Sequence, residues 1–412
     1  MRKLLLTTLA VLLTTAGMYA GRMAYTTNID GRVRSYAIYT PTQLREHVVI
    51  LLHGMGETYD DYDRSTMQAF ADAHRCALIL PQALPEQDET LLELLSVASG
   101  YQAELGELKE ALAKSAWGAN VYVTIDDLCT YLEVSKSDLE LMVNFLYPQF
   151  KPYLQAGKIQ INKDVDDSKF IEYLRVNNNR DGACDTNIIG CSLGGAMAYK
   201  YAFEDPSKVR KLVDASGFVS KGVQVPSNYN IPTFIIHSKT DEIVPYEGGL
   251  FNRPIEDFIG ELVRTNTHGA PVIRVINPYE PYDEQVDVRD WTDDPEVLVY
   301  KPHKASHSLV KDLANIGVDL YGTIGDFLFD DPSAADEATA DASALNIYPN
   351  PVENIANVSI DGKYEIFNLA GVMVASGDTE NGTIDLSSLI AGRYILMLTG
   401  SNDVYRSIII KK

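Results

Sequence analysis

The sequence predicts an α/β domain built on a mostly parallel sheet flanked by helices, followed by a small all-β sandwich. Three observations lead to this fold class. Short apolar runs alternate with helix-prone segments over residues 26–330, which is the pattern of a parallel sheet covered by helices. Six short strand-like segments separated by turns follow over 345–412, a spacing typical of a small sandwich. Between them, residues 331–344 are acidic and poor in large apolar side chains, which predicts a linker.

The first twenty residues predict a secretory signal peptide. Arg2 and Lys3 form a basic start, an apolar run covers residues 4–13, and small residues lead to Ala20, after which we expect cleavage. The apolar run is too short to remain as a membrane span. We find no other segment long and apolar enough to cross a bilayer, so the mature chain is expected to be soluble.

Composition narrows the set of expected partners. The 412 residues carry a formal net charge of −22 at pH 7, so we expect no nucleic-acid partner and repulsion from anionic membranes. Neither Cys-x-x-Cys nor His-Glu-x-x-His occurs, and the acidic runs 60–63 and 283–287 are interpreted as solvated surface. We therefore expect no metal and no cofactor. Four cysteines could pair in an oxidising compartment, but their spacing defines no disulfide framework.

A glycine-rich run supplies the candidate nucleophile. A β-rich segment precedes Ser192 and a helix-prone segment follows it, which is the strand, turn and helix context of a nucleophile elbow. Gly190 and Gly194 have a steric reason to be glycine, because so sharp a turn leaves no room for side chains two residues away on either side. By itself, this run is equally compatible with an ordinary glycine-rich loop, so the interpretation depends on its partners.

Candidates for an acid and a base follow Ser192 in the order in which this kind of fold supplies them. Asp241 lies just beyond the predicted buried strand 231–237 and is the candidate acid. Two histidines follow the last apolar strand of the domain. We favour His307 as the base, because it lies at the start of the final helix, whereas His303 lies one residue after a proline. An imidazole would take the serine proton, and the aspartate would hold the imidazole in the required tautomer.

A second loop is predicted to stabilise an oxyanion. The apolar strand 48–52 is followed by His53, Gly54 and Met55, so the backbone N–H groups of Met55 and of Leu193 are the expected donors. We interpret His53 and Gly54 as support for this loop, with His53 a hydrogen-bonded structural histidine rather than a catalytic one.

These motifs resemble those of the secreted α/β-hydrolases of the polyhydroxybutyrate depolymerase and feruloyl esterase type. The similarity covers about residues 26–330 and rests on the runs 53–62, 77–83 and 166–171. It implies a serine hydrolase of the α/β-hydrolase fold whose triad is Ser192, Asp241 and one of His303 or His307.

Two segments depart from that family. Residues 85–165 form a much longer link than expected and are leucine-rich, which predicts an inserted helical cap that packs over the strand ends and limits acyl length. The segment 245–295 is also long, and it lacks the aromatic-flanked Gly-Gly-His typical of the depolymerases. The acyl and alcohol parts of the substrate therefore stay open.

The C-terminal segment resembles the sorting domain of the type IX secretion system of the Bacteroidetes. The matching runs are 348–352, 366–371, 384–394 and the terminal Lys411-Lys412. The resemblance implies that the type IX secretion machinery exports the protein through the periplasm and outer membrane, so that it is secreted or held at the cell surface. An ordinary carbohydrate-binding or adhesion sandwich is the alternative interpretation.

Together these patterns predict a secreted serine esterase that acts through an acyl-enzyme on polysaccharide-linked acetyl or feruloyl esters. The alternatives are a polyester depolymerase or a peptidase of the same fold. A further alternative is a catalytically inactive surface protein that keeps the fold for binding.

Overall fold

The protein is described by a computed structural model. It covers residues 21–42, 46–179, 185–276, 285–309, 318–329, 347–349, 351–358, 361–368, 373–379, 381–399 and 404–412. The predicted signal peptide, 1–20, and the predicted linker, 331–344, lie outside the described residues. The chain divides into two compact units, one ending at Phe329 and the other beginning at Asp330, and each unit has its own apolar core.

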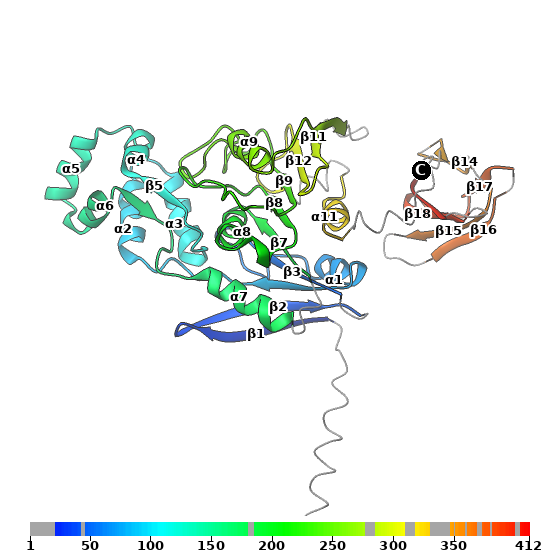
Figure 1. The fold of residues 1–412 in the computed structure, drawn as a ribbon, viewed down its shortest axis with the longest axis horizontal. Helices are drawn as coiled ribbons and strands as arrows, with labels where there is room; N and C mark the ends of the chain where they lie inside the picture. Colours follow the sequence, from blue (N-terminus) through cyan, green and yellow to red (C-terminus); the bar gives the residue numbers. More distant parts are fainter. Residues whose placement is uncertain are drawn as a thin grey trace, which may run out of the picture. The chain divides into compact units, whose positions relative to one another are not determined.

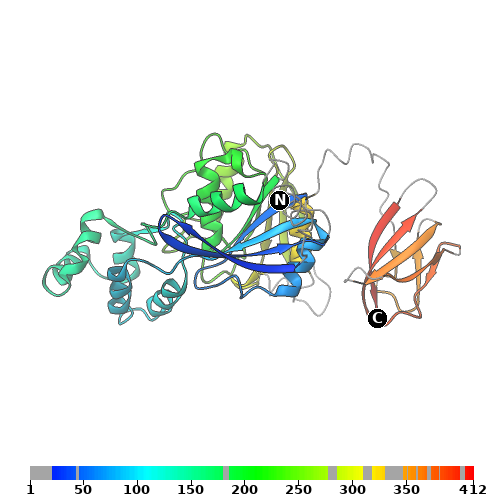
Figure 2. The same cartoon turned by 90° about the horizontal axis from the view of Figure 1, so that it is seen from below.

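A ten-stranded sheet forms the centre of the first unit (Figures 1 and 2). Its strands are β1 (Gly21–Ile29), β2 (Arg32–Thr40), β3 (His47–Leu52), β4 (Cys76–Pro81), β7 (Asp185–Cys191), β8 (Leu212–Ala215), β9 (Thr233–Ile236), β10 (Val272–Ile276), β11 (Val286–Trp291) and β12 (Val297–Pro302). They lie in the order β1-β2-β4-β3-β7-β8-β9-β12-β11-β10. The stretch from β4 to β12 is parallel, and antiparallel strands extend both edges.

Helices cover both faces of this sheet, and β3 shows how the sequence divides between them. Its residues Val48, Ile50 and Leu52 belong to the same apolar cluster as α7 (Asp167–Asn178), α8 (Leu193–Glu204) and α9 (Ile255–Thr265). Its alternate residues Val49 and Leu51 pack with α1 (Arg64–Ala73) and α11 (Leu320–Phe329). A strand buried on both sides is an almost continuous apolar run, as expected for a parallel sheet. The predicted fold class, an α/β-hydrolase sheet flanked by helices, is confirmed.

The chain between β4 and α7 forms a helical insertion. It contains α2 (Glu89–Ala98), α3 (Glu104–Lys114), β5 (Tyr122–Thr124), α4 (Ile125–Tyr131), α5 (Lys136–Phe145), η1 (Pro148–Phe150), α6 (Lys151–Ala156) and β6 (Lys158–Gln160). The strands β5 and β6 pair with each other and not with the main sheet. Figures 1 and 2 both show these helices projecting to one side of the sheet. A further short helix, η2 (Pro206–Lys208), follows α8.

The second unit is a small all-β sandwich, as its sequence spacing predicts. One sheet contains β13 (Ile347–Tyr348), β14 (Ile355–Val358) and β17 (Thr383–Asp385), and the other contains β16 (Met373–Asp378), β15 (Lys363–Asn368), β18 (Gly392–Thr399) and β19 (Val404–Lys411). Its core includes Val352, Ile366, Leu396 and Ile409, all fully buried. In neither unit does a helix of the described residues combine the length and apolar character that a bilayer span needs.

Candidate active site

Ser192 lies at the junction between β7 and α8, at the carboxyl end of the central strand. β7 ends at Cys191 and α8 begins at Leu193. Ser192 itself has φ 53° and ψ −120°, a conformation that an L-residue adopts only under strain. Strained residues of this kind concentrate at functional sites, where the surrounding structure holds them in place.

The two glycines predicted on either side of Ser192 are sterically required. A Cβ atom on Gly190 would lie 2.5 Å from the Cα atom of Gly195. A Cβ atom on Gly194 would collide with the carbonyl oxygen of Leu52 on β3. A side chain at either position would therefore push the elbow away from the neighbouring backbone.

A continuous hydrogen-bond chain joins Ser192 to His307 and Asp241. Nε2 of His307 lies 2.9 Å from Oγ of Ser192, and Nδ1 lies 2.8 Å and 3.0 Å from the two carboxylate oxygens of Asp241. Asp241 follows β9 and His307 follows β12. Because these two strands are parallel neighbours, the loops after them meet at the edge of the sheet where the elbow lies. The structure thus brings together the three residues selected from the sequence.

Asp241 is held in place as an orienting carboxylate. Its side chain is fully buried, and Oδ1 accepts hydrogen bonds from the N–H groups of Ile243 (3.0 Å) and Val244 (2.8 Å). Burial raises the pKa of Asp241, but the hydrogen bond and charge of His307, together with the Val244 N–H, outweigh burial, so the pKa lies below its usual range. The Asp241 carboxylate accepts a hydrogen bond from the Nδ1–H group of His307, and in this tautomer Nε2 can accept the serine proton.

The second candidate base, His303, lies apart from this chain. Its Nε2 atom lies 2.9 Å from Oδ2 of Asp287 on β11, and both side chains are partly exposed. No hydrogen bond within the described residues joins His303 to Ser192 or Asp241. Of the two histidines left open by the family resemblance, the structure places His307 at Ser192.

The loop after β3 passes directly beside Ser192. A Cβ atom on Gly54 would lie only 3.4 Å from Cβ of Ser192. Within this loop the Gly54 N–H donates to Oε2 of Glu57 (2.8 Å) and the Gly56 N–H donates to the carbonyl oxygen of Ser115 (2.9 Å). The N–H of Met55 has no acceptor among the described residues, and the N–H of Leu193 at the start of α8 has none either. These two groups are the oxyanion donors selected from the sequence.

The ring of His53, at the start of this loop, is held by hydrogen bonds at both nitrogens. Its side chain is buried, and Nε2 accepts a hydrogen bond from the Ala83 N–H (3.1 Å). Nδ1 must therefore carry the proton, which it donates to the carbonyl oxygen of Gly54 (2.7 Å). Burial lowers the pKa of His53 to about 4, so the ring is neutral at neutral pH. These contacts agree with a structural role for His53.

The helical insertion also forms hydrogen bonds with the loop after β3. The Ser115 hydroxyl donates to the carbonyl oxygen of Glu57 (2.6 Å), and Nε1 of Trp117 donates to that of His53 (2.8 Å). Both Ser115 and Trp117 are fully buried. Together with the hydrogen bond from the Gly56 N–H to Ser115, three hydrogen bonds join residues 115–117, the base of the insertion, to residues 53–57.

A cavity of about 370 Å³ opens at Ser192. Tyr62, Leu309 and Tyr321 supply apolar surface, and the carboxylates of Glu57 and Asp63 lie along its wall. Its volume is near the lower end of the range of about 300–1,000 Å³ usual for small-molecule sites.

No residue of 85–165 lines this cavity, and helices α2 to α6 extend sideways from the sheet (Figure 2). The role of this insertion as a cap that limits acyl length therefore stays a prediction. Only the base of the insertion reaches the site, through the loop after β3.

Two contributors to the site were missed by sequence reasoning. Ser216, with φ 53°, lines the cavity and donates from Oγ to the carbonyl oxygen of His307 (3.1 Å). Its signal was present, because it directly follows the buried strand β8 at the end of the sheet where functional loops gather. Ser115 carried no such signal, since its role depends on a contact with a loop 58 residues away in the sequence.

The described residues contain no group of three or more His, Cys, Asp or Glu side chains arranged to hold a metal ion. Cys76, Cys129 and Cys191 form no disulfide, and Cys184 lies outside the described residues.

Fold and site together define a chain of the α/β-hydrolase fold with a serine, histidine and aspartate in hydrogen-bond contact. Residues 346–412 match the secretion system C-terminal sorting domain. The resemblance of this segment to a type IX sorting domain is therefore confirmed, and the protein is exported to the cell surface or secreted. No curated protein matches the chain significantly.

The chain is similar to several solved structures, with which it shares little sequence. A cold-adapted esterase from an Arctic intertidal metagenomic library is 12% identical, with a TM-score of 0.39 over 74% of this chain and 92% of its own. An α/β serine hydrolase homologue from Coxiella burnetii is 13% identical, with a TM-score of 0.39 over 74% and 97%. An acetyl xylan esterase from Aspergillus awamori is 12% identical, with a TM-score of 0.37 over 72% and 99%.

Proposed function

We propose that the protein is an exported serine hydrolase that cleaves carboxylic esters through an acyl-enzyme. The observation that carries this proposal is the hydrogen-bond chain from Asp241 through His307 to Ser192. The loop after β3 and the start of α8, which lie next to Ser192, carry the Met55 and Leu193 N–H groups, and neither group has an acceptor among the described residues. A nucleophile, a base, an orienting acid and oxyanion donors are the parts that acyl transfer requires.

Each group has one task in the proposed reaction. Oγ of Ser192 attacks the ester carbonyl carbon while Nε2 of His307 takes the hydroxyl proton. The N–H groups of Met55 and Leu193 donate to the oxyanion of the tetrahedral intermediate. As this intermediate collapses, the C–O bond to the alcohol breaks and His307 gives its proton to the departing oxygen. Water then attacks the acyl-enzyme, His307 takes the water proton, and Ser192 regains it when the carboxylic acid leaves.

The proposed substrates are polysaccharide-linked acetyl or feruloyl esters. The size of the cavity supports a short or single-ring acyl group rather than a long chain. The aromatic surfaces of Tyr62 and Tyr321 support an aromatic acyl group.

Two measurements test this proposal. The full chain should react with an active-site-directed fluorophosphonate, and Ser192→Ala should take up none. A hydrolysis panel of acetyl, butyryl and feruloyl esters and a peptide amide then separates an esterase from a peptidase or a polyester depolymerase. A native chain that takes up no label would support the inactive binding protein instead.

The base of the insertion provides a test of the oxyanion loop. We expect Ser115→Ala to lower kcat about tenfold with little change in KM, because it removes a hydrogen bond that holds the loop without altering the cavity wall. Steady-state kinetics on an acetyl ester measures both constants. Thr130→Ala, which removes an exposed hydrogen bond within helix α4, is the matched control and should leave both unchanged. Equal loss in the two variants would contradict a role for this contact.

The second unit is expected to be dispensable for turnover. The residues that line the cavity all belong to the first unit, and the two units have separate cores. Deleting everything after Ser333 should leave ester turnover within about twofold, since domains with separate cores usually function independently. The same deletion should block surface delivery in the native host, measured by cell fractionation. Loss of turnover in vitro, or continued delivery, would count against this division.

A further inference from the structure

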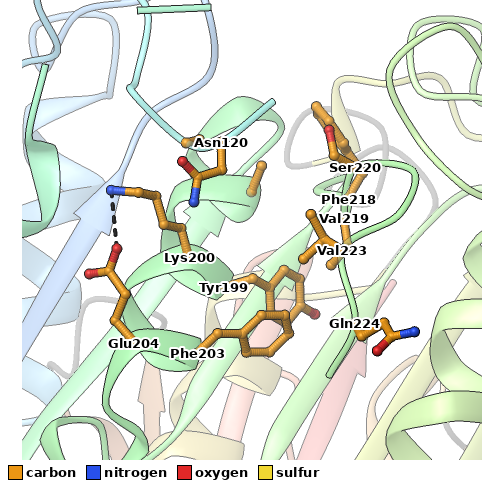
Figure 3. A pocket seen from close by; sticks show the side chains of 12 residues that line it. Asn120, Tyr199, Lys200, Phe203, Glu204, Phe218, Val219, Ser220, Val223 and Gln224 are labelled. Atoms are coloured by element: carbon orange, nitrogen blue, oxygen red, sulfur yellow. Dashed lines mark ion pairs between the residues drawn. The ribbon is translucent and has the colours of Figure 1, made fainter. Parts of the chain in front are cut away.

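A second cavity, of about 200 Å³, lies beside α8 and shares no lining residue with the cavity at Ser192. Figure 3 shows Asn120 and Lys200 on one side of it and the loop 218–224 on the other. The rings of Tyr199 and Phe203 lie at the bottom between them. We propose that this cavity is a binding site for one uncharged sugar ring of a polysaccharide chain.

The wall of the cavity formed by the loop 218–224 is fixed before any ligand arrives. The backbone N–H of Tyr122 donates to Oγ of Ser220 (3.3 Å), and the Tyr122 hydroxyl donates to the carbonyl oxygen of Lys221 (2.6 Å). Lys221 also forms an ion pair with Asp127 (2.7 Å) on helix α4 of the insertion. Gly222 has φ +79°, and a Cβ atom there would lie 2.7 Å from the Tyr122 hydroxyl oxygen. A wall held in this way does not have to be ordered when a ligand binds.

The inner surface of the cavity is apolar. Phe203 contributes a half-buried ring, and the rings of Tyr199 and Phe218 lie deeper with Val219. The volume is below the range of about 300–1,000 Å³ that holds drug-sized ligands, so it suits a single small ring. One face of a sugar ring carries mainly C–H groups, which can pack against such a surface.

Two amide side chains stand at the edge of the apolar surface. Neither Asn120 nor Gln224 has a hydrogen-bond partner among the described residues, and both are exposed. Asn120 has φ 57°, a left-handed backbone conformation that is uncommon outside glycine. An amide offers both donors and an acceptor. A sugar hydroxyl also donates and accepts, so the two kinds of group complement each other.

The charges within the cavity offset each other. Nζ of Lys200 lies 3.3 Å from Oε1 of Glu204 and donates to Oγ of Ser168 (3.0 Å). The dashed line in Figure 3 marks the ion pair. A carboxylate ligand would meet Glu204, and a cationic ligand would meet Lys200. The paired charges therefore favour a ligand without charge, which excludes acidic sugars from the proposed class.

Helix α8 links this cavity to Ser192. The helix begins at Leu193, and Ala196 and Phe203 both line the cavity. At a rise of about 1.5 Å per residue, these positions lie ~6 Å and ~16 Å along the helix axis from Ser192. A sugar ring held here lies within a few sugar units of the proposed reacting ester. Its use in holding a polymeric substrate rests on the proposed function, whereas the binding itself requires no turnover.

Binding is measured by titration calorimetry on the full chain carrying Ser192→Ala, with xylotetraose, cellotetraose and mannotetraose as neutral probes and trigalacturonate as the acidic comparison. We expect at least one neutral probe to bind and trigalacturonate not to bind. Adding Asn120→Ala or Phe203→Ala should raise the Kd about fivefold or more, the effect of losing one hydrogen bond or one packing contact. Tyr101→Ala, an exposed aromatic residue of the insertion outside the cavity, is the matched control and should leave the Kd unchanged.

Two further measurements distinguish binding in this cavity from misfolding of the variants and from binding at Ser192. Asn120→Ala and Phe203→Ala in the otherwise native chain should react with fluorophosphonate at the native rate, which shows that both variants are folded. Native chain already phosphonylated at Ser192 should still bind the neutral probe.

The inference is overturned if no neutral probe binds, if binding survives both substitutions, or if trigalacturonate binds more tightly. Loss of binding on phosphonylation would place the sugar in the cavity at Ser192 and would also overturn it. A native chain that never reacts with fluorophosphonate would contradict the proposed function instead, and the binding test on Ser192→Ala would still decide this inference.

Discussion

Ser192→Ala is expected to lower kcat for ester hydrolysis by at least ~10⁴-fold, the scale seen when a triad nucleophile is removed from a serine hydrolase. The physical reason is that no other hydroxyl of the described residues lies within hydrogen-bond distance of Nε2 of His307. Without Oγ, the reaction has to proceed by direct attack of water on the ester. The oxyanion donors of Met55 and Leu193 would still provide a small residual rate.

The measurement is initial-rate hydrolysis of an acetyl ester by purified full chain, with fluorophosphonate uptake followed in parallel. Ser216→Ala is a useful comparison, because this serine also lines the cavity but contacts the backbone of His307 and not its ring. It should retain fluorophosphonate uptake, since its loss leaves the nucleophile in place. Turnover that persists in Ser192→Ala but is lost in Ser216→Ala would show that Ser192 is not the nucleophile.

Asp241→Asn is expected to lower kcat by roughly 10³–10⁴-fold with a smaller effect on KM. An uncharged amide cannot stabilise the imidazolium form of His307, and it can favour the tautomer in which Nε2 rather than Nδ1 carries the proton. The site is sensitive to this change because both carboxylate oxygens lie within 3.0 Å of Nδ1.

Asp287→Asn provides the matched control for this prediction. It makes the same substitution in the other aspartate and histidine pair, in which Asp287 lies 2.9 Å from His303. We expect Asp287→Asn to retain kcat within about threefold, because partly exposed ion pairs contribute little to stability and this pair lies outside the hydrogen-bond chain of Ser192, His307 and Asp241. A loss confined to Asp287→Asn would make His303 the base instead of His307. Comparable losses in both variants would indicate general destabilisation, which thermal unfolding of each variant would reveal.

The sequence by itself determined those features whose physics is local. A serine between glycines, preceded by an apolar strand and followed by a helix, indicates the elbow because strand, turn and helix are set by near neighbours. Asp241 could be selected for the same reason, since it directly follows a buried strand whose end must face the site. The C-terminal sandwich was likewise indicated by its regular strand spacing and its motifs.

Only the tertiary structure decided which distant segments meet. His303 and His307 are four residues apart, and the choice between them depends on how the loop after β12 turns toward Asp287 or toward Asp241. The leucine-rich periodicity of 85–165 indicated helices but not the direction in which they extend, so their absence from the cavity could not be foreseen. Ser115 and Trp117 acquire their contacts with the loop after β3 through packing across about sixty residues of sequence. Local sequence patterns specify individual helices, strands and turns. The side-chain contacts between these elements depend on how the whole core packs.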